Sequence, residues 1–333
     1  MEKFKFNIQL FAGELNTNLT SSAGLTDEMK TYYSDYLIDN AVPKLVHDQF
    51  GQKHPIPKNG GKTIEFRKYN PLPKLLTPIS EGVTPDGQSL NMSTIEATVA
   101  QYGGYITLSD ILLLTAIDNN LVQATKLLGA QAGATLDTIT REVLNGGTNV
   151  IFSGGVESRE DLVGGAETGN CYLTVDDIKK AVRLLKNQNA EKINGSWVAI
   201  IHPDVSYDLT NDPAWKDVKT YSDPDDMYEG EIGKLFGVRF VETTEAKVWA
   251  KAGAGGRAVY STLVLGDNAY GVTELSGGGL EHIVKQLGSA GTGDPLNQRA
   301  TAGWKATKVA ERLVENYMVR IESASTFNPA ANN

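Results

Sequence analysis

The hydrophobic positions of the chain first alternate as in an extended segment and then repeat as in a helix. Apolar and polar residues alternate over residues 1–11, which predicts a short extended arm whose apolar face is formed by Phe4, Phe6, Ile8 and Leu10. Residues 12–25 are small and polar and predict a flexible link. A helical stripe then begins at Thr26 and ends at Pro43. An arm with one apolar face needs a surface on which to lie.

Two strand-like runs follow, at Lys62–Tyr69 and from about Met92 to Leu108. The roughly 20 residues between them are too many for a tight hairpin turn. This stretch contains four prolines, which are Pro71, Pro73, Pro78 and Pro85. The pattern predicts a projecting two-stranded ribbon whose tip has no core of its own. Such a ribbon needs neighbours to be stable.

The longest helical pattern covers roughly residues 110–145, with Ser109 as its N-cap and Asn145-Gly146-Gly147 at its end. A glycine-rich link then leads to a mixed α/β module at about 172–270. Within it, Thr174 and Asp177 predict a helix start, Trp197–Ile201 predicts a buried central strand, and Pro203 opens a short helix. Strand patterns at 236–241, 258–265, 280–287 and 303–321 complete the chain.

Composition narrows the classes of function. With 333 residues and 41% hydrophobic content, the chain is long enough for roughly two domains. Its formal charge of −9 disfavours a protein that grips nucleic acid along its length, and it keeps free subunits soluble and mutually repelling. The single cysteine, Cys171, excludes an internal disulfide framework and is predicted to be a small buried residue. No run approaches the roughly 18 apolar residues of a membrane span.

The motifs that could support catalysis lack the neighbouring residues and elements that each of them needs. Gly60-Gly61-Lys62-Thr63 resembles the end of a phosphate-binding loop, and residues 253–258 match a relaxed dinucleotide-binding pattern, yet a strand follows each of them where a helix is required. The four histidines show no metal-ligand spacing, and the acidic cluster at Asp223, Asp225 and Asp226 lacks the rest of a calcium loop. We therefore assign no catalytic, cofactor-binding or metal-binding residues. A mechanical or binding function is expected.

The order of these parts resembles the major capsid protein of tailed bacteriophages, with the fold named for phage Hong Kong ninety-seven. Residues 79–85 (Ile-Ser-Glu-Gly-Val-Thr-Pro) resemble the loop segment that such coats place on a neighbouring subunit, and residues 105–110 resemble the start of their spine helix. Residues 294–299 (Asp-Pro-Leu-Asn-Gln-Arg), followed by Gly303-Trp304-Lys305-Ala306, resemble the phage N-four type coat family. The opening residues 5–12 are typical of coats from phages of Gram-positive bacteria.

This resemblance implies an α+β fold with an N-arm, an extended β-hairpin loop, a peripheral domain with a long spine helix, and an axial α/β domain. The implied boundaries are an arm at 1–25, an N-terminal helix region at 26–54, the extended loop at 55–108, a peripheral domain at 109–170 and 269–325, an axial domain at 171–268, and a tail at 326–333. The candidate contacts between subunits are Phe4, Phe6, Ile8, Leu10, Glu81, Pro85, Arg299 and Trp304.

The resemblance also implies partners. The chain is expected to form hexamers and pentamers of an icosahedral head that encloses double-stranded DNA without sequence-specific binding or membrane contact. A separate scaffolding protein is expected, because no N-terminal scaffolding segment is evident. A portal and decoration proteins are the other expected partners. The resemblance further implies that the chain is made in the host cytoplasm and resides in the virion. Two alternatives stay open: an encapsulin-like bacterial compartment, marked by a cargo-binding groove, and an α/β enzyme, marked by a pocket of perturbed titratable groups.

Overall fold

The computed structural model describes residues 17–18, 45–55, 62–69, 72–79, 81–82, 84, 86–115, 120–165, 169–216, 233–273, 280–289, 293–329 and 332–333. The predicted arm at 1–11 and the whole of the helix predicted from Thr26 to Pro43 lie outside these residues. The chain divides into two compact units. Unit 1 comprises residues 1–42, 101–135 and 278–307, and unit 2 comprises residues 43–100, 136–277 and 308–333.

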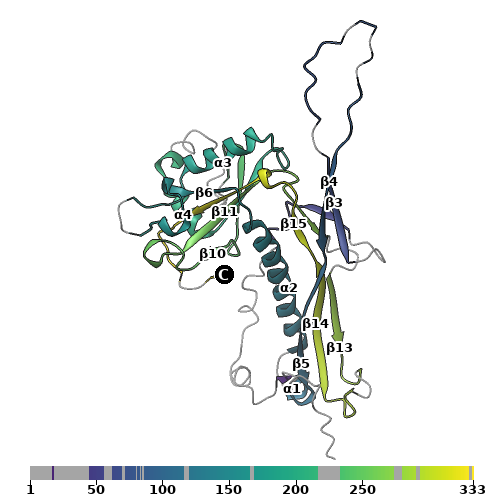
Figure 1. The fold of residues 1–333 in the computed structure, drawn as a ribbon. Coiled ribbons are helices and arrows are strands. Elements are labelled where there is room, and N and C mark those ends of the chain that lie inside the picture. Colours follow the sequence, from purple (N-terminus) through teal and green to yellow (C-terminus); the bar gives the residue numbers. More distant parts are fainter. Residues whose placement is uncertain are drawn as a thin grey trace, which may run out of the picture. The chain divides into compact units, whose positions relative to one another are not determined.

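Unit 2 is built around a mixed β-sheet (Figure 1). Its strands follow the order β6 (Val150–Phe152), β16 (Met318–Ser323), β11 (Val259–Leu265), β7 (Trp197–Ile201), β9 (Val238–Glu242) and β8 (Lys234–Leu235), with β10 (Val248–Trp249) also paired to β11. Strand β11 runs antiparallel to β7 and β16, whereas β7 and β9 are parallel. Every residue of β7 is buried, as its continuous apolar run predicts, and every residue of β11 is buried as well.

Alternate residues of β7 reach the two faces of this sheet. Trp197, Ala199 and Ile201 pack with the buried residues of helices α3 (Val175–Asn187) and α4 (Pro203–Asn211). Val198 and Ile200 pack with Leu144 of helix α2 (Asn120–Asn145) and with Tyr270. Because a strand alternates its side chains with a period of two, one run of five apolar residues serves both layers of the core.

Local sequence signals set the ends of α3 and α4, as predicted. The Thr174 side chain accepts a hydrogen bond from the backbone N–H of Asp177, and the Asp177 carboxylate accepts from the N–H of Thr174, which forms a capping box. Pro203 occupies the first turn of α4, and the side chain of His202 accepts from the N–H of Asp204.

Unit 1 contains a second sheet with the order β1 (Thr17–Asn18), β5 (Ala100–Ser109), β14 (Arg299–Lys308) and β13 (Leu280–Lys285). The predicted spine is helical over Asp110–Thr115 (α1) and Asn120–Asn145 (α2), and the residues between lie outside the described part. Leu108, Leu112 and Ala124 form the apolar cluster that joins β5 to these helices.

The run predicted as one strand from Met92 to Leu108 is two strands. Strand β4 (Met92–Thr98) pairs with β3 (Thr63–Tyr69), whereas β5 pairs with β14 and β1. The break falls at Val99, whose N–H donates to the carbonyl of Lys62 (2.8 Å). Hydrophobic alternation continues across the break because both strands bury one face, so the pattern does not reveal the change of partner.

Two further strand predictions need correction. The run predicted over 303–321 is divided into β14, β15 (Ala310–Arg312) and β16, with a short 3-10 turn at Glu315–Tyr317. The strand predicted from Phe236 begins at Val238, because Phe236 (φ 50°) and Gly237 (φ 82°) form the turn between β8 and β9. Strand β15 pairs with β12 (Tyr270–Thr273), which also pairs with β2 (Gln52–His54).

Candidate assembly surfaces

The predicted ribbon is present and its base is anchored in the core of unit 2. Strands β3 and β4 pair antiparallel, from Thr63 opposite Thr98 to Tyr69 opposite Met92. Ile64, Phe66 and Ala97 are buried, and Ile95, Val99, Val309 and Leu313 pack against them. The Phe66 ring also meets the ring of His54 edge-on, with 4.7 Å between centroids. The base therefore gains its order from its own subunit.

Gly271 of β12 makes room for this base. A Cβ atom at position 271 would lie 2.4 Å from Cε1 of Phe66, a distance that real side chains essentially never show. Glycine at this position lets the Phe66 ring approach the backbone of β12. The close approach fixes the base of the ribbon against the small sheet of β15, β12 and β2.

The tip of the ribbon has the opposite character (Figure 1). The described residues of 72–91, together with Met92, are all exposed. Six of them are large and apolar, and we call these six the apolar tip: Leu72 (52% exposed), Leu75 (75%), Leu76 (86%), Ile79 (75%), Leu90 (72%) and Met92 (47%). Exposed apolar groups gathered in this way mark surfaces that bind another molecule.

Two of the predicted contact residues fall in the tip. Glu81 is exposed in a turn beside Gly82, whose φ of +78° requires a glycine-like backbone, and Glu81 forms no ion pair with any described residue. Pro85 lies outside the described residues, as do Phe4, Phe6, Ile8 and Leu10 of the predicted arm.

The other two predicted contact residues lie in unit 1. Arg299 is half-buried at the start of β14, where its N–H donates to the Asp294 carboxylate (2.8 Å) and its guanidinium donates to the carbonyl of Gly293 (3.2 Å). Trp304 is only 6% exposed, and its indole N–H donates to Oε1 of Gln131 (3.2 Å). Trp304 thus packs inside its own unit and offers little surface to another subunit.

A groove on the β5–β14–β13 sheet of unit 1 has a floor of backbone at Gly103 and Gly303. Tyr105, Ile283, Lys285 and Lys305 are among the side chains that line it. Its ionisable side chains are two lysines and two tyrosines, with no carboxylate among them. Within the described residues, no group of three or more His, Cys, Asp or Glu side chains could hold a metal ion.

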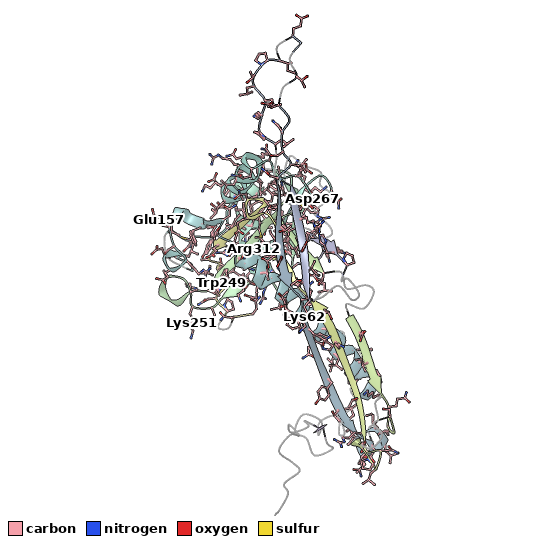
Figure 2. The ribbon with its side chains drawn as sticks, turned by 45° about the vertical axis from the view of Figure 1, so that its right-hand side comes forward. Lys62, Glu157, Trp249, Lys251, Asp267 and Arg312 are labelled. Atoms are coloured by element: carbon pink, nitrogen blue, oxygen red, sulfur yellow. The ribbon has the colours of Figure 1, made fainter. Side chains whose placement is uncertain are left out.

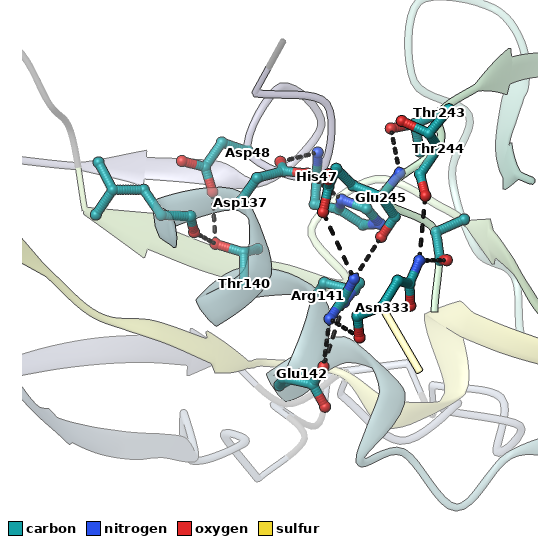
Figure 3. A network of polar contacts seen from close by, with 12 residues as sticks. His47, Asp48, Asp137, Thr140, Arg141, Glu142, Thr243, Thr244, Glu245 and Asn333 are labelled. Carbon is teal, nitrogen blue, oxygen red and sulfur yellow. Dashed lines mark hydrogen bonds and ion pairs between the residues drawn. The ribbon is translucent and has the colours of Figure 1, made fainter. Parts of the chain in front are cut away.

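Sequence reasoning missed a buried polar network in unit 2 (Figure 3). The Lys308 ammonium contacts the Asp48 carboxylate, whose other oxygen accepts from the Thr140 hydroxyl (2.5 Å). Beside this group, the Asp137 carboxylate binds both the backbone N–H (2.8 Å) and the ring Nδ1 (2.7 Å) of His47. Asp137 in α2 and Lys308 in β14 occupy positions at which the periodicity of the helix and of the strand predicts a buried apolar residue. These two charged residues were the signal in the sequence that could have revealed the network.

One helical turn beyond this network, Arg141 links two distant segments to α2. Its guanidinium donates to the carbonyls of Glu245 (2.8 Å) and Asn333 (3.0 Å) and to the carboxylate of Glu142 (2.9 Å). Burial opposes ionisation of Glu142, but its hydrogen bonds with Lys247 and Arg141 outweigh this effect and lower its pKa. The network stabilises the fold and contains no catalytic arrangement.

A second polar cluster joins α4 to β11. The Tyr260 hydroxyl donates to the Asp204 carboxylate (2.7 Å), and burial together with this acid raises the pKa of Tyr260 well above its usual value. Burial lowers the pKa of His202, against the opposing influence of Asp204 and Glu242. A third cluster lies at Trp249, labelled in Figure 2, where Arg159 stacks on the indole (3.8 Å) and forms a two-pronged ion pair with Glu322.

Each glycine motif is followed by a strand where a nucleotide site needs a helix. Ala254–Gly256 is a single 3-10 turn, and β11 follows it where a dinucleotide site needs a helix. Lys62, labelled in Figure 2, leads directly into β3. Cys171 is 2% exposed, as predicted for a small core residue. No helix in the described residues is both long and apolar enough to cross a lipid bilayer.

Comparison with known proteins points to one kind of protein. Residues 114–277, just under half of the chain, match a family described as phage capsid protein. No curated protein sequence matches the chain. Among solved structures, the capsid of Ralstonia phage GP4 matches with a TM-score of 0.68 at 13% identity, covering 94% of this chain and 100% of that one.

Two cyanophage capsids extend this result. The capsid of cyanophage P-SCSP1u matches with a TM-score of 0.65 at 13% identity, covering 90% of this chain and 94% of that one. The capsid of cyanophage Pam1 matches with a TM-score of 0.58 at 15% identity, covering 97% and 100%. These likenesses establish the fold over nearly the whole chain and confirm the predicted α+β capsid fold. Residues 114–277 are thus similar in sequence to phage capsid proteins, and nearly the whole chain has the fold of phage capsid subunits.

Proposed function

We propose that the chain is a major capsid protein, which assembles into hexamers and pentamers of a closed shell around double-stranded DNA, with a separate scaffolding protein, a portal and decoration proteins as partners. The observation that carries the proposal is the contrast between the two ends of the ribbon. The base is buried against its own unit, whereas the side chains of the apolar tip are exposed. Obligate interfaces exceed about 2,000 Å² and are rich in apolar surface, and a tip of this kind supplies such surface only after assembly.

The domain names carry over as part of this proposal. The peripheral name stays proposed for 109–170 and 269–325 and the axial name for 171–268, although residues 136–170 and 308–325 belong to unit 2 together with 171–268. Glu81 and Arg299 remain proposed contacts between subunits. For Phe4, Phe6, Ile8, Leu10 and Pro85, the proposal rests on the sequence alone.

The register of the ribbon allows a clean deletion test. Tyr69 and Met92 are paired partners, so replacing residues 70–91 with Asn-Gly closes a two-residue hairpin without changing the register. We expect the free subunit to unfold at an unchanged temperature while shells no longer form in the presence of scaffolding protein. Electron microscopy and sedimentation report the shells.

A substitution series separates the apolar tip from the length of the loop. Changing Leu75, Leu76 and Ile79 to Ser should abolish assembly, whereas the same change at Lys74, Thr77 and Asp86, which are also exposed, should not. Hydrogen exchange across the described residues of 72–91 should be fast in free subunits and slow in shells. Normal shells from the Leu-to-Ser series, or equal exchange in both states, would contradict the proposal.

A further inference from the structure

The exposed side of helix α3 is basic. Its apolar residues, among them Ile178 and Leu185, are buried in the core of unit 2, which leaves the opposite side of the helix to solvent. Four exposed cations lie on that side or just past the end of the helix, and we call them the basic face: Lys179, Arg183, Lys186 and Lys192.

Three of these cations form one row along the helix. Lys179, Arg183 and Lys186 are separated by four and then three positions, so their side chains lie one above another on the same side of α3. Seven residues of helix rise about 10 Å. One strand of B-form DNA carries a phosphate for every ~3.4 Å of its axis, so a row of this length matches about three phosphates.

No described carboxylate neutralises the basic face. Lys180, on the next side of the helix, is held by Asp176 (3.0 Å) and Asp177 (3.2 Å), and we leave it out of the face for this reason. Among the described residues, no acid lies within ion-pair distance of a member of the face, and this includes the exposed Glu191 beside Lys192. The charges of the face are therefore available to a ligand.

Aromatic rings hold three of the cations in place. The Lys179 ammonium stands 4.8 Å from the centre of the Phe236 ring. Lys192 and Lys186 stand 4.8 Å and 5.8 Å from the centre of the Trp197 ring. Contacts of this kind orient an ammonium group without removing its charge, so the cations stay able to bind an anion.

The composition of the face favours nucleic acid over a protein partner. Three of its four members are lysines, a residue type that is depleted where proteins bind one another, and protein interfaces place apolar side chains at their centre. Lysine and arginine with no acid between them are the usual contacts to a phosphate backbone. Because the whole chain carries −9, it repels a polyanion except at a local basic surface such as this one.

We propose that the basic face of α3 binds the phosphate backbone of double-stranded DNA, so that this side of α3 faces the interior of the shell. The inference rests on the proposed function for the source of the DNA. Contact through four cations gives weak binding that depends on salt and does not read the sequence. A contact of this strength, repeated in every copy, holds DNA against the shell at many points and grips it at none.

Fluorescence anisotropy of a labelled duplex of about 20 base pairs, titrated with the free wild-type chain, tests the contact without any need for shells. Because four cations displace about four counterions, the affinity should fall by about 10²-fold between 50 and 200 mM salt. Duplexes rich in A·T and rich in G·C should bind equally well, since the backbone is common to both.

A charge-removal variant and a matched control locate the binding surface. Lys179→Gln, Arg183→Gln and Lys186→Gln together should weaken duplex binding by about tenfold or more at 50 mM salt, and should reduce the slope of log affinity against log salt by about 2.7. The control removes the same charge from exposed lysines on other elements, by Lys53→Gln, Lys126→Gln and Lys251→Gln, and should bind as the wild type does; Lys251 is labelled in Figure 2. Circular dichroism confirms that each chain is folded.

Each remaining outcome decides between the proposal and its alternatives. Equal affinities and equal salt slopes for the wild type and the α3 variant would overturn the proposal, as would a strong preference for one duplex sequence. Unchanged duplex binding together with loss of shells from the folded α3 variant would show that the face binds another protein surface, and would also overturn it. Failure of the wild type and the control to form shells, with duplex binding still dependent on the face, would remove the proposed function and support the DNA contact.

Discussion

Removal of one charge from the Lys308–Asp48 pair should destabilise unit 2 strongly. The Lys308 side chain has no exposed surface, and that of Asp48 is 11% exposed. Lys308→Met leaves the Asp48 carboxylate with the Thr140 hydroxyl as its remaining described partner. Breaking a buried pair in this way costs about 3–5 kcal/mol. For a unit of 150–250 residues, this loss lowers the melting temperature by about 6–20 °C.

The double variant separates the pair from the packing of its side chains. Asp48→Leu with Lys308→Met removes both charges, and the Thr140 hydroxyl keeps an acceptor in the carbonyl of Leu136 (3.4 Å). Because no charge is then buried without a partner, the double variant should be more stable than either single variant by about 2 kcal/mol or more.

Urea unfolding of the free subunit, followed by tryptophan fluorescence, measures the free energy of unfolding of the wild type, the two single variants and the double variant, which together form a double-mutant cycle. A coupling energy near zero, with the double variant losing the sum of the two single losses, would refute the reasoning. That result would mean that each side chain acts alone, and that the ammonium and carboxylate are not compensating each other in the interior.

Three further predictions concern the ribbon and the pH response. Phe66→Ala (2% exposed) should cost about 3–5 kcal/mol in urea unfolding, whereas Leu76→Ala (86% exposed) should cost less than about 0.5 kcal/mol; similar losses would contradict the division into base and tip. Gly271→Ala should lower the free energy of unfolding by about 1–3 kcal/mol because the new Cβ overlaps the Phe66 ring, and adding Phe66→Leu should restore part of that loss. An unchanged stability of Gly271→Ala would show that the backbone of β12 moves to relieve the overlap. Burial lowers the pKa of His202, so as the pH falls the unfolded chain takes up a proton at this histidine before the folded chain does. The free energy of unfolding is therefore at its full value above about pH 6.5 and decreases below that pH, by at most about 1.4 kcal/mol per pH unit. His202→Asn keeps an acceptor for the N–H of Asp204 and should flatten thermal unfolding between pH 7 and pH 5; an unchanged slope would assign it to another group.

Elements with local signals could be read from the sequence. The Thr174–Asp177 capping box, Pro203 at the start of α4 and the apolar run Trp197–Ile201 each lie within a few residues, and all three occur in the structure as predicted. Each depends on backbone preferences or on burial of a single segment, so no knowledge of distant partners is needed.

Features that depend on distant partners could not be read. The end of β4 at Thr98 is set by where β3 stops pairing, and the burial of Lys308 is set by Asp48, 260 residues away. Among the candidate contacts, the exposure of Glu81 follows from its loop, but the burial of Trp304 depends on Gln131 of α2. A motif resemblance gives a residue its place in the chain without showing which way its side chain points.

The division of the chain between the two units has a consequence during synthesis. Strand β5 ends at Ser109 and its partner β14 begins at Arg299, about 190 residues later. At 5–20 residues per second, the ribosome takes roughly 10–40 s to deliver that partner. Throughout this interval β5 has no β14 to pair with, and its apolar face has no completed sheet to join. A chaperone that shields nascent strands would therefore be expected to raise the yield of folded chain.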